Sequence, residues 1–377
     1  MKAEICIIGA GATGLMTAYF LSKFGEEDII ILEKNYPGSG STFRCATGIR
    51  ASFTTEEHIV LLRHAIDLWK ELSDELGFFY KRGGYLWLFT REKDVEAFKE
   101  FSKLHNKYGV PTRIITPEEV KELVPQINID PIIAALYDPL AGKADPFETI
   151  FALYSYCVKH GIRIMLNTKA LELKVRNKEI VGVKTNKGEI ECSNVVVAAG
   201  YGTRELVKTV GIDLPLENEP RHALITEFFK PAFDPLLIDW ANSAYIVQTK
   251  SGAFLIGAEV HEKPGNPLSP RLDFLIKAAK TWVRFFPWLR EVNILRYWQG
   301  YYVMSPDKHP IIGPIDEING LYIAAGYSGH GFMMSPCVGE AISQWICKGK
   351  PSYPQAERLT YQRIKEGRFI KELAVFG

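Results

Sequence analysis

The sequence lacks paired cysteines, long apolar runs and an excess of either charge sign. Its six cysteines are scattered without a C-x-x-C pair, so they indicate neither a zinc site nor a secreted disulfide framework. No apolar run approaches the roughly 18 residues of a membrane helix. The 45 basic and 44 acidic side chains nearly cancel, which gives no electrostatic reason to expect nucleic acid as a partner. We therefore expect a cytoplasmic protein with reduced thiols, no metal site and no transmembrane segment.

What the sequence contains is an ordinary globular composition over a long chain. The 377 residues are 47% hydrophobic and 24% charged, a mixture that argues against disorder. A chain of this length is expected to form two or three domains. Aromatic residues make up 12% of the chain, which would suit a site with flat walls and equally a large core.

The clearest motif lies near the N-terminus. An apolar run at 4–8 leads into a G-x-G-x-x-G turn, and a helix to about Lys23 and a second apolar run at 29–32 follow. Interrupting glycines, and the lack of a small-residue cleavage site, favour a buried strand and helix over a signal peptide. A strand, this turn, a helix and an acidic residue roughly 20 positions on form the pattern of a dinucleotide-binding unit. The expected cofactor residues are Gly9, Gly11, Ala12, Thr13, Gly14 and Glu33.

Each of these positions has a mechanical reason. Gly9 permits the tight turn, Gly11 lets the backbone approach a pyrophosphate, and Gly14 allows close helix packing. The helix N-terminus faces the phosphates. Glu33 can accept a hydrogen bond from a ribose hydroxyl.

A loop rich in glycine and hydroxyl groups follows at 34–42, and its donors would suit phosphates. A solvated turn is the alternative. The next segment, 43–50, combines two arginines with small residues, which suits a flavin edge and an anionic substrate. The expected cofactor residues here are Lys34, Ser41, Thr42, Arg44, Ala46, Thr47, Gly48 and Ile49.

The rest of the chain alternates between helical and strand patterns. A segment at 139–146 has a turn signal at each end and is expected to be a connector. A three-strand meander over 171–192 precedes an apolar strand that ends at Ala199 and Gly200. The remaining predicted helices are 55–77, 92–108, 117–123, 146–160 and 270–286, and the remaining strands are 83–89, 162–166, 222–229, 244–249 and 253–259.

A second glycine-rich turn lies near the C-terminus, between a strand at 321–326 and a helix to about Cys347. A helix N-terminus in such a turn offers free N–H groups and a positive dipole. These would stabilise the negative charge of a reduced flavin. The expected cofactor residues are Gly326, Gly329, His330, Gly331, Phe332, Met333 and Met334.

Three stretches together carry a family resemblance: 38–50 (GSGSTFRCATGIR), 142–147 (GKADPF) and 326–334 (GYSGHGFMM). With them the chain resembles, end to end, the FAD-dependent amine and amino-acid oxidoreductases of the glycine oxidase, sarcosine oxidase and D-amino-acid oxidase superfamily. Within that group it most resembles the β subunits of archaeal dye-linked L-proline dehydrogenases.

The resemblance implies a mixed fold with an α/β part and an antiparallel β part. A discontinuous Rossmann-like FAD-binding domain of the glutathione-reductase type would comprise 1–82, 144–215 and 300–377, and a substrate domain built on a mixed or antiparallel sheet would comprise 83–143 and 216–299. The resemblance also implies that Ala170 meets the adenine through its backbone, and that Ala199 and Gly200 lie along the cofactor.

The sequence departs from the family pattern at four places. Tyr302 stands where glycine and D-amino-acid oxidases carry a carboxylate-binding arginine, and Met333 replaces a lysine of sarcosine oxidases. Gly300 stands where sarcosine oxidases link FAD through a cysteine, so a non-covalent cofactor is expected. The strand at 254–257 lacks the lysine that activates oxygen in sarcosine oxidases, which favours a dehydrogenase over an oxidase.

The resulting hypothesis is hydride transfer from the carbon next to a secondary amine to flavin N5, with release of the imine. Arg50 is expected to bind the substrate carboxylate, with a surface ion pair as the alternative. Arg44 could share this task or face a phosphate. Tyr245 and Tyr302 are expected to wall the site, although a strand tyrosine is more often core.

Partners and rival functions stay open at this point. Relatives of this β type imply an α subunit in a hetero-oligomer, with a homo-oligomer as the alternative, and an FMN at the subunit junction would offer an electron exit. A sarcosine- or glycine-type oxidase is one alternative function. A binding protein that keeps the FAD fold without redox chemistry is the other.

Overall fold

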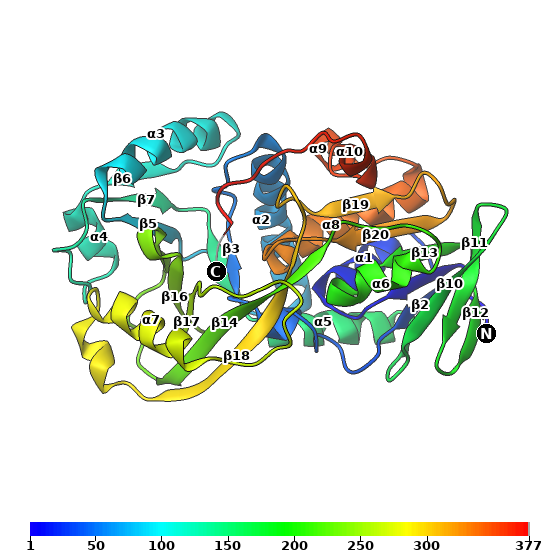
Figure 1. The fold of residues 1–377 in the computed structure, drawn as a ribbon, viewed down its shortest axis with the longest axis horizontal. Helices are drawn as coiled ribbons and strands as arrows, with labels where there is room; N and C mark the ends of the chain where they lie inside the picture. The colour runs from blue at the N-terminus through cyan, green and yellow to red at the C-terminus, as the bar shows by residue number, and fades with distance from the viewer. Residues whose placement is uncertain (376–377) are drawn as a thin grey trace.

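The computed structural model describes residues 1–375 and places two large sheets at opposite ends of an elongated molecule (Figure 1). A six-stranded sheet includes β1 and β2 of the predicted dinucleotide-binding unit, and an eight-stranded sheet forms the other end. Between them lies a small sheet of three short strands, β3, β4 and β8. The functional residues described below come from all three sheets.

The six-stranded sheet is a mainly parallel sheet of apolar strands. β1 pairs in parallel with β2 and β13, and β13 pairs in parallel with β20, while β19 joins antiparallel at one edge. Strands buried on both faces are expected to be continuously apolar, and every residue of β1 and β2 is buried. The strand order is β19 (Ile311–Pro314), β20 (Leu321–Ala325), β13 (Asn194–Val197), β1 (Ile5–Ile8), β2 (Ile29–Leu32) and β9 (Arg163–Met165).

Most helices of this half pack on one face of the sheet, whereas the meander and the short helix at Thr203–Lys208 pack on the other. α1 is buried from Ala12 to Leu21, because α8 packs directly against it. A Cβ at Gly339 of α8 would lie 2.8 Å from Met16 of α1, so glycine is required at this crossing. The helices of this half are α1 (Ala12–Lys23), α2 (Glu56–Leu76), α5 (Pro146–Lys159), α6 (Thr203–Lys208), α8 (Gly331–Lys348), α9 (Pro354–Glu357) and α10 (Tyr361–Lys365), and the meander is β10 (Ala170–Arg176), β11 (Glu179–Thr185) and β12 (Gly188–Glu191).

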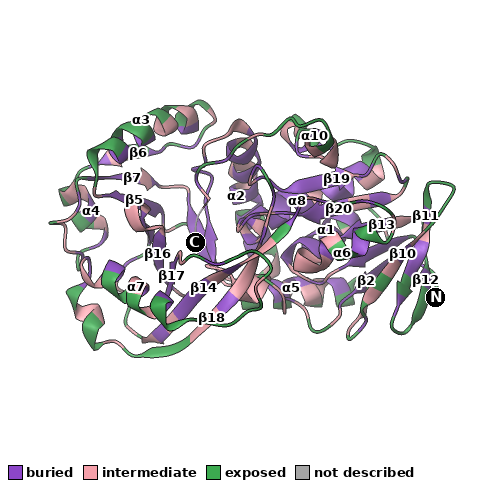
Figure 2. Ribbon diagram, viewed as in Figure 1, coloured by how far each residue is buried: buried purple, intermediate pink, exposed green. Residues whose placement is uncertain are grey.

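The eight-stranded sheet is antiparallel except where β15 pairs in parallel with β5. Its helices α3, α4 and α7 lie on the outside and turn exposed faces to solvent (Figure 2). The strand order is β18 (Ile294–Met304), β14 (Glu217–Phe228), β17 (Ala253–Ala258), β16 (Ala244–Gln248), β15 (Leu236–Asp239), β5 (Tyr85–Phe89), β7 (Ala134–Asp138) and β6 (Arg113–Ile115), and the helices are α3 (Glu92–Lys107), α4 (Pro117–Leu123) and α7 (Leu272–Val283).

The small central sheet corrects one prediction. The segment 139–146 is not a plain connector, because it contains β8 (Gly142–Ala144), which pairs with β3 (Gly48–Ile49) and β4 (Tyr80–Lys81). A Cβ at Gly142 would lie 2.3 Å from the carbonyl oxygen of Lys81. The turn-like glycine therefore serves a close strand pairing.

The predicted mixed fold, with its interrupted FAD-binding part, is confirmed. The division at 299/300 falls inside β18, which runs from Ile294 to Met304 in the eight-stranded sheet. We propose that the two large sheets mark the two domains and that β18 passes from one to the other. Among residues 1–375, none of the helices combines the length and apolarity that crossing a bilayer requires.

Candidate active site

A cavity extends from the carboxyl end of β1, past the carboxyl ends of β13 and β20, to residues of the eight-stranded sheet. Ligands of open α/β sheets bind at the carboxyl ends of the strands. All predicted site residues except Gly14, Ile49 and Met334 line this cavity. The residues predicted around the two glycine turns thus lie together along one cavity.

The first glycine turn shows which positions serve packing and which leave room. A Cβ at Gly9, whose φ is 111°, would lie 2.4 Å from the carbonyl oxygen of Ala198, and a Cβ at Gly14 would lie 1.9 Å from that of Gly9. A Cβ at Gly11 would meet no described atom nearer than the Thr42 hydroxyl, at 3.4 Å. Gly11 thus faces open space at the N-terminus of α1, where a pyrophosphate fits.

Glu33 holds this turn in place. Its side chain is 7% exposed, and its carboxylate accepts hydrogen bonds from the backbone N–H of Ala10 at 3.0 Å and of Asn35 at 2.8 Å. The carboxylate also lines the cavity. A carboxylate has about four acceptor positions. Glu33 can therefore hold the loop in place and still accept a hydrogen bond from a ribose hydroxyl, as the sequence predicts.

The loop after β2 folds over the cavity and is closed by Arg44. The guanidinium of Arg44 donates to the carbonyl oxygens of Ser39 and Gly40. Ser41 donates to the carbonyl oxygen of Tyr301 at 3.0 Å, and Thr42 accepts from the backbone N–H of Ala12 at 3.2 Å. The loop therefore forms a wall of the cavity through Lys34 and residues 38–42, while Asn35, Tyr36 and Ser41 are exposed to solvent.

The second glycine turn presents the N-terminus of α8 to the cavity. Gly326 and Gly329 have φ of 72° and 99°, so the turn needs glycine at both positions. His330 caps α8, and Gly331, Phe332 and Met333 line the cavity. Burial, with His58 and Arg50 nearby, holds the pKa of His330 well below its ordinary range, so its ring is neutral at pH 7.

Arg50 lies at the end of the cavity that borders the eight-stranded sheet, here called the substrate end because the sequence predicts substrate binding there. It is 5% exposed, and its guanidinium stacks on Phe53 at 3.6 Å from the ring centre. It donates to the carbonyl oxygens of Ser52 at 2.7 Å and Ala374 at 2.6 Å, and no acidic side chain within residues 1–375 forms an ion pair with it. Burial lowers its pKa to about 10, so the group stays charged at neutral pH. The alternative of a surface ion pair is wrong.

Three tyrosines surround this end of the cavity. Tyr245 and Tyr302 were predicted, and Tyr85 of β5 was missed. Burial raises the pKa of all three phenols, so each is protonated and can donate a hydrogen bond. A Cβ at Gly48 would lie 1.6 Å from the Tyr85 hydroxyl, and a Cβ at Gly329 would lie 2.4 Å from the Tyr302 ring. Because Gly48 and Gly329 have no side chain, the phenols of Tyr85 and Tyr302 can lie directly against the backbone that lines the cavity.

Comparisons with known proteins agree with this geometry. A family model described as "FAD dependent oxidoreductase" (DAO) matches residues 4–345. The solved L-proline dehydrogenase from P. horikoshii is 40% identical, with a TM-score of 0.95, over 98% of this chain and 99% of that one. Glycine oxidase from Bacillus cereus ATCC 14579 shares the fold at 22% identity, with a TM-score of 0.86, over 96% of this chain and 99% of that one.

Curated relatives extend the same picture. The sarcosine oxidase subunit beta of Rhodobacter capsulatus is 28% identical over all of this chain and 92% of its own length. The mitochondrial dimethylglycine dehydrogenase of Rattus norvegicus is 29% identical over 94% of this chain, which spans only 44% of that protein. The chain belongs to the DAO family of FAD-dependent oxidoreductases and binds FAD.

Proposed function

We propose that this protein is an FAD-dependent dehydrogenase that oxidises a secondary-amine amino acid, L-proline, to the imine and passes the electrons to an acceptor other than oxygen. Arg50 is the observation that carries the proposal, as a buried cation that lines the cavity without an acidic partner in residues 1–375. The 40% identity to an L-proline dehydrogenase supports the substrate.

The side chains at the substrate end suit an amino acid. The guanidinium of Arg50 can bind a carboxylate through two parallel hydrogen bonds. The phenols of Tyr85, Tyr245 and Tyr302 wall the same space and can donate to the substrate. Bound FAD supplies the acceptor for the hydride that leaves the carbon next to the nitrogen. The task of the protein is to hold that carbon in place and to exclude water.

The preference for an acceptor other than oxygen rests on the position of the lysines. Among the described residues that line the cavity, the lysines are Lys34 and Lys169, both at the glycine-turn end. β17, where sarcosine oxidases carry the oxygen-activating lysine, reads Phe254-Leu-Ile-Gly257. A non-covalent FAD is part of the proposal, since Gly300 replaces the linking cysteine and lies close to Arg44.

The protein is further proposed to act as one subunit of a larger enzyme. Three of the curated relatives, at 27–28% identity, are named sarcosine oxidase subunit beta. An α subunit, with an FMN at the junction as electron exit, is the arrangement that follows. Chromatography of the flavins released by acid from the native enzyme would test the non-covalent FAD and the FMN. A covalent FAD would stay with the precipitated protein, and FMN would elute separately from FAD.

The function is tested by anaerobic mixing with L-proline, sarcosine, glycine and pyrrolidine, the last being proline without its carboxylate. We expect L-proline to bleach the flavin at the lowest concentration. Pyrrolidine should need about 100-fold more, because it lacks the charge-assisted bonds to Arg50. Dye reduction should exceed oxygen consumption under air.

The same measurements test the alternatives. Hydrogen peroxide formed as fast as a dye is reduced would favour an amine oxidase of the sarcosine or glycine type. A flavin that no amino acid bleaches would favour a binding protein without redox activity. Equal bleaching by pyrrolidine and L-proline would remove Arg50 from the substrate site.

A further inference from the structure

The C-terminal segment 366–375, here called the C-terminal strap, runs back from α10 to the substrate end of the cavity. In Figure 1 it leaves α10 and crosses between the two ends of the molecule towards β3. It has no helix or strand of its own. Backbone N–H groups of Ile370 and Glu372 bond to Asp307, and that of Leu373 bonds to the Thr54 hydroxyl at 3.0 Å. The strap is therefore tied down along its length.

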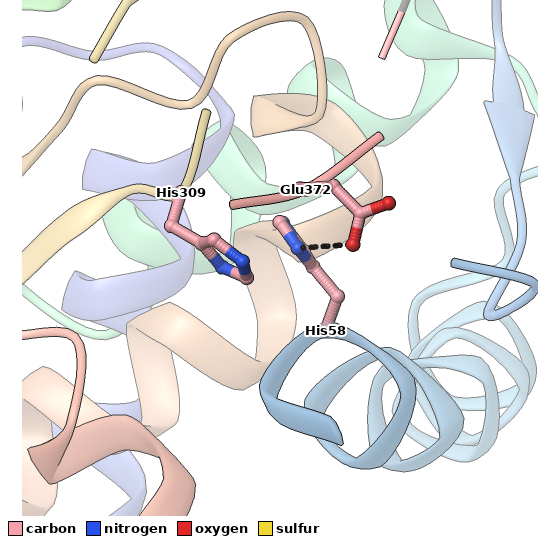
Figure 3. Close-up of side chains that lie close together, drawn as sticks. All are labelled: His58, His309 and Glu372. Atoms are coloured by element: carbon pink, nitrogen blue, oxygen red, sulfur yellow. Dashed lines mark ion pairs between the residues drawn. The ribbon is translucent and has the colours of Figure 1, made fainter. Parts of the chain in front are cut away.

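Glu372 is the buried anchor of the strap. Its side chain has no exposed surface, and its carboxylate accepts hydrogen bonds from the backbone and hydroxyl of Thr54 and from the hydroxyl of Thr55 at 2.9 Å. It also pairs with Nδ1 of His58 at 3.4 Å (Figure 3). Burial alone would raise the pKa of Glu372, but the bonds from His58 and Thr54 outweigh it and hold that pKa well below its ordinary range.

His309 completes this cluster without turning it into a metal centre. Its ring lies against that of His58 (Figure 3), with the ring centres 4.0 Å apart. Its Nε2 bonds to the Thr55 hydroxyl at 3.2 Å. Ring nitrogens direct their lone pairs within the ring plane, so stacked rings point them side by side rather than at one ion. Burial lowers the pKa of His309 to about 2. The cluster is a hydrogen-bonded lock between Glu372 and the start of α2.

This lock acts on both groups that hold Arg50. One acceptor of the Arg50 guanidinium is the carbonyl oxygen of Ala374, whose own N–H donates to Glu372 at 2.8 Å. The other is the carbonyl oxygen of Ser52, two residues before Thr54 in the segment that Glu372 fixes. The Glu372 carboxylate therefore bonds directly to Ala374, which carries one of these carbonyls, and to Thr54, two residues after the other.

We propose that Glu372 is a positioning residue that, through the C-terminal strap, orients Arg50 for the carboxylate of the substrate. The inference rests on the proposed function. Arg50 keeps further N–H donors free for a ligand, because a guanidinium has five and its two carbonyl partners use two. A fixed rotation of the planar group is what bidentate recognition needs.

The test compares Glu372→Ala and Glu372→Gln with Glu366→Ala, a change at an exposed position of the same strap. The readout is the ratio of kcat/KM for L-proline to that for pyrrolidine, together with flavin content and melting temperature. We expect Glu372→Ala to lower this ratio about tenfold through the KM for L-proline, as the loss of one good hydrogen bond would. Glu372→Gln should restore part of it, and Glu366→Ala should leave it unchanged.

A purely structural role would lower activity on both substrates equally and leave the ratio as it was, which would overturn the inference. Should Glu372→Ala fail to fold, Ala374→Pro removes one N–H bond to Glu372 and leaves the rest of the lock intact. It too should lower the ratio, and an unchanged ratio would again overturn the inference. Arg50→Met separates the two proposals. If Arg50→Met does not alter the ratio, the proposed function fails. If Arg50→Met lowers the ratio but Glu372→Ala does not, only the role of Glu372 is contradicted.

Discussion

Two buried arginines, Arg50 and Arg363, lie in opposite electrostatic situations. Arg363 is 1% exposed, and two of its nitrogens bond to the carboxylate of Asp307 at 2.9 and 3.0 Å. Its remaining donors reach carbonyl oxygens, among them those of Leu359 and His309. Arg50 is buried almost as deeply but has two carbonyl partners and two aromatic rings around it.

We interpret Arg363 as a structural charge and Arg50, in line with the proposed function, as a charge that binds a ligand. A charge removed from water is costly unless an opposite charge and hydrogen bonds compensate it. Asp307 compensates Arg363 inside the protein, whereas Arg50 lies at a cavity where a carboxylate can enter. If the proposed function holds, Arg50 serves binding specificity, whereas Arg363 serves stability.

Replacing Arg363 should have the largest effect, and on stability. Arg363→Met leaves the Asp307 carboxylate buried without its partner, and we expect the free energy of unfolding to fall by about 3–5 kcal/mol. Denaturant unfolding followed by circular dichroism measures this. Glu317→Gln, which breaks the exposed pair with Lys365, is the matched control and should cost less than about 1 kcal/mol. The kcat/KM per bound flavin should be unchanged in Glu317→Gln, whereas Arg363→Met can also lower it, because Asp307 anchors the C-terminal strap.

Replacing Arg50 should have the opposite profile. Arg50→Met should lower kcat/KM for L-proline by about 2–4 kcal/mol, or roughly 30- to 1000-fold, because the substrate carboxylate then enters an apolar pocket. The free energy of unfolding should fall much less than in Arg363→Met, since no carboxylate at ion-pair distance loses its partner. Steady-state kinetics and denaturant unfolding measure the two effects. A loss of stability like that of Arg363→Met would show that Arg50 is structural and would end the comparison.

The same distinction applies to two glycines of the first turn, with a smaller effect. A Cβ at Gly11 would make only an ordinary contact with the Thr42 hydroxyl, whereas a Cβ at Gly14 would overlap the Gly9 carbonyl. Gly11→Ala should therefore leave the melting temperature of the apoprotein unchanged and weaken FAD binding by about 1–3 kcal/mol, since its methyl group occupies the pyrophosphate position. Gly14→Ala should instead lower the melting temperature of the apoprotein, because its methyl group overlaps the backbone. Quenching of flavin fluorescence measures the affinity, and equal melting temperatures for both variants would contradict the assignment.

The sequence predicts those parts of the fold and of the site whose conformation is determined by residues close together in the chain. The turn at Gly9–Gly14 carries its own conformational signal, and the apolar runs of β1 and β20 agree with it, so the cofactor end could be located correctly. β15, at Leu236–Asp239, was missed because three apolar residues before an aspartate are too short a run to show a period, and its pairing with β5 links positions about 150 residues apart. Glu372 was missed for the same reason, since its partners at 54–58 are remote in sequence.

Tyr85 was also missed in the sequence, and its replacement should have the smallest effect on activity. Its strand reads Tyr-Leu-Trp-Leu-Phe and is buried throughout, so no alternation marks the tyrosine as facing a cavity. Its hydroxyl reaches the position above Gly48, and burial raises its pKa, so it can act as a donor at any physiological pH.

Tyr85→Phe should lower kcat/KM for L-proline by about 0.5–1.5 kcal/mol, the net value of one neutral hydrogen bond. Tyr36→Phe, at a tyrosine that is 58% exposed, is the control and should have no effect. If Tyr85→Phe lowered kcat/KM as much as Arg50→Met does, the charge of Arg50 would not be the dominant feature of the site. If it had no effect at all, Tyr85 would be wall rather than donor, and Arg50 would bind the carboxylate without help from this phenol.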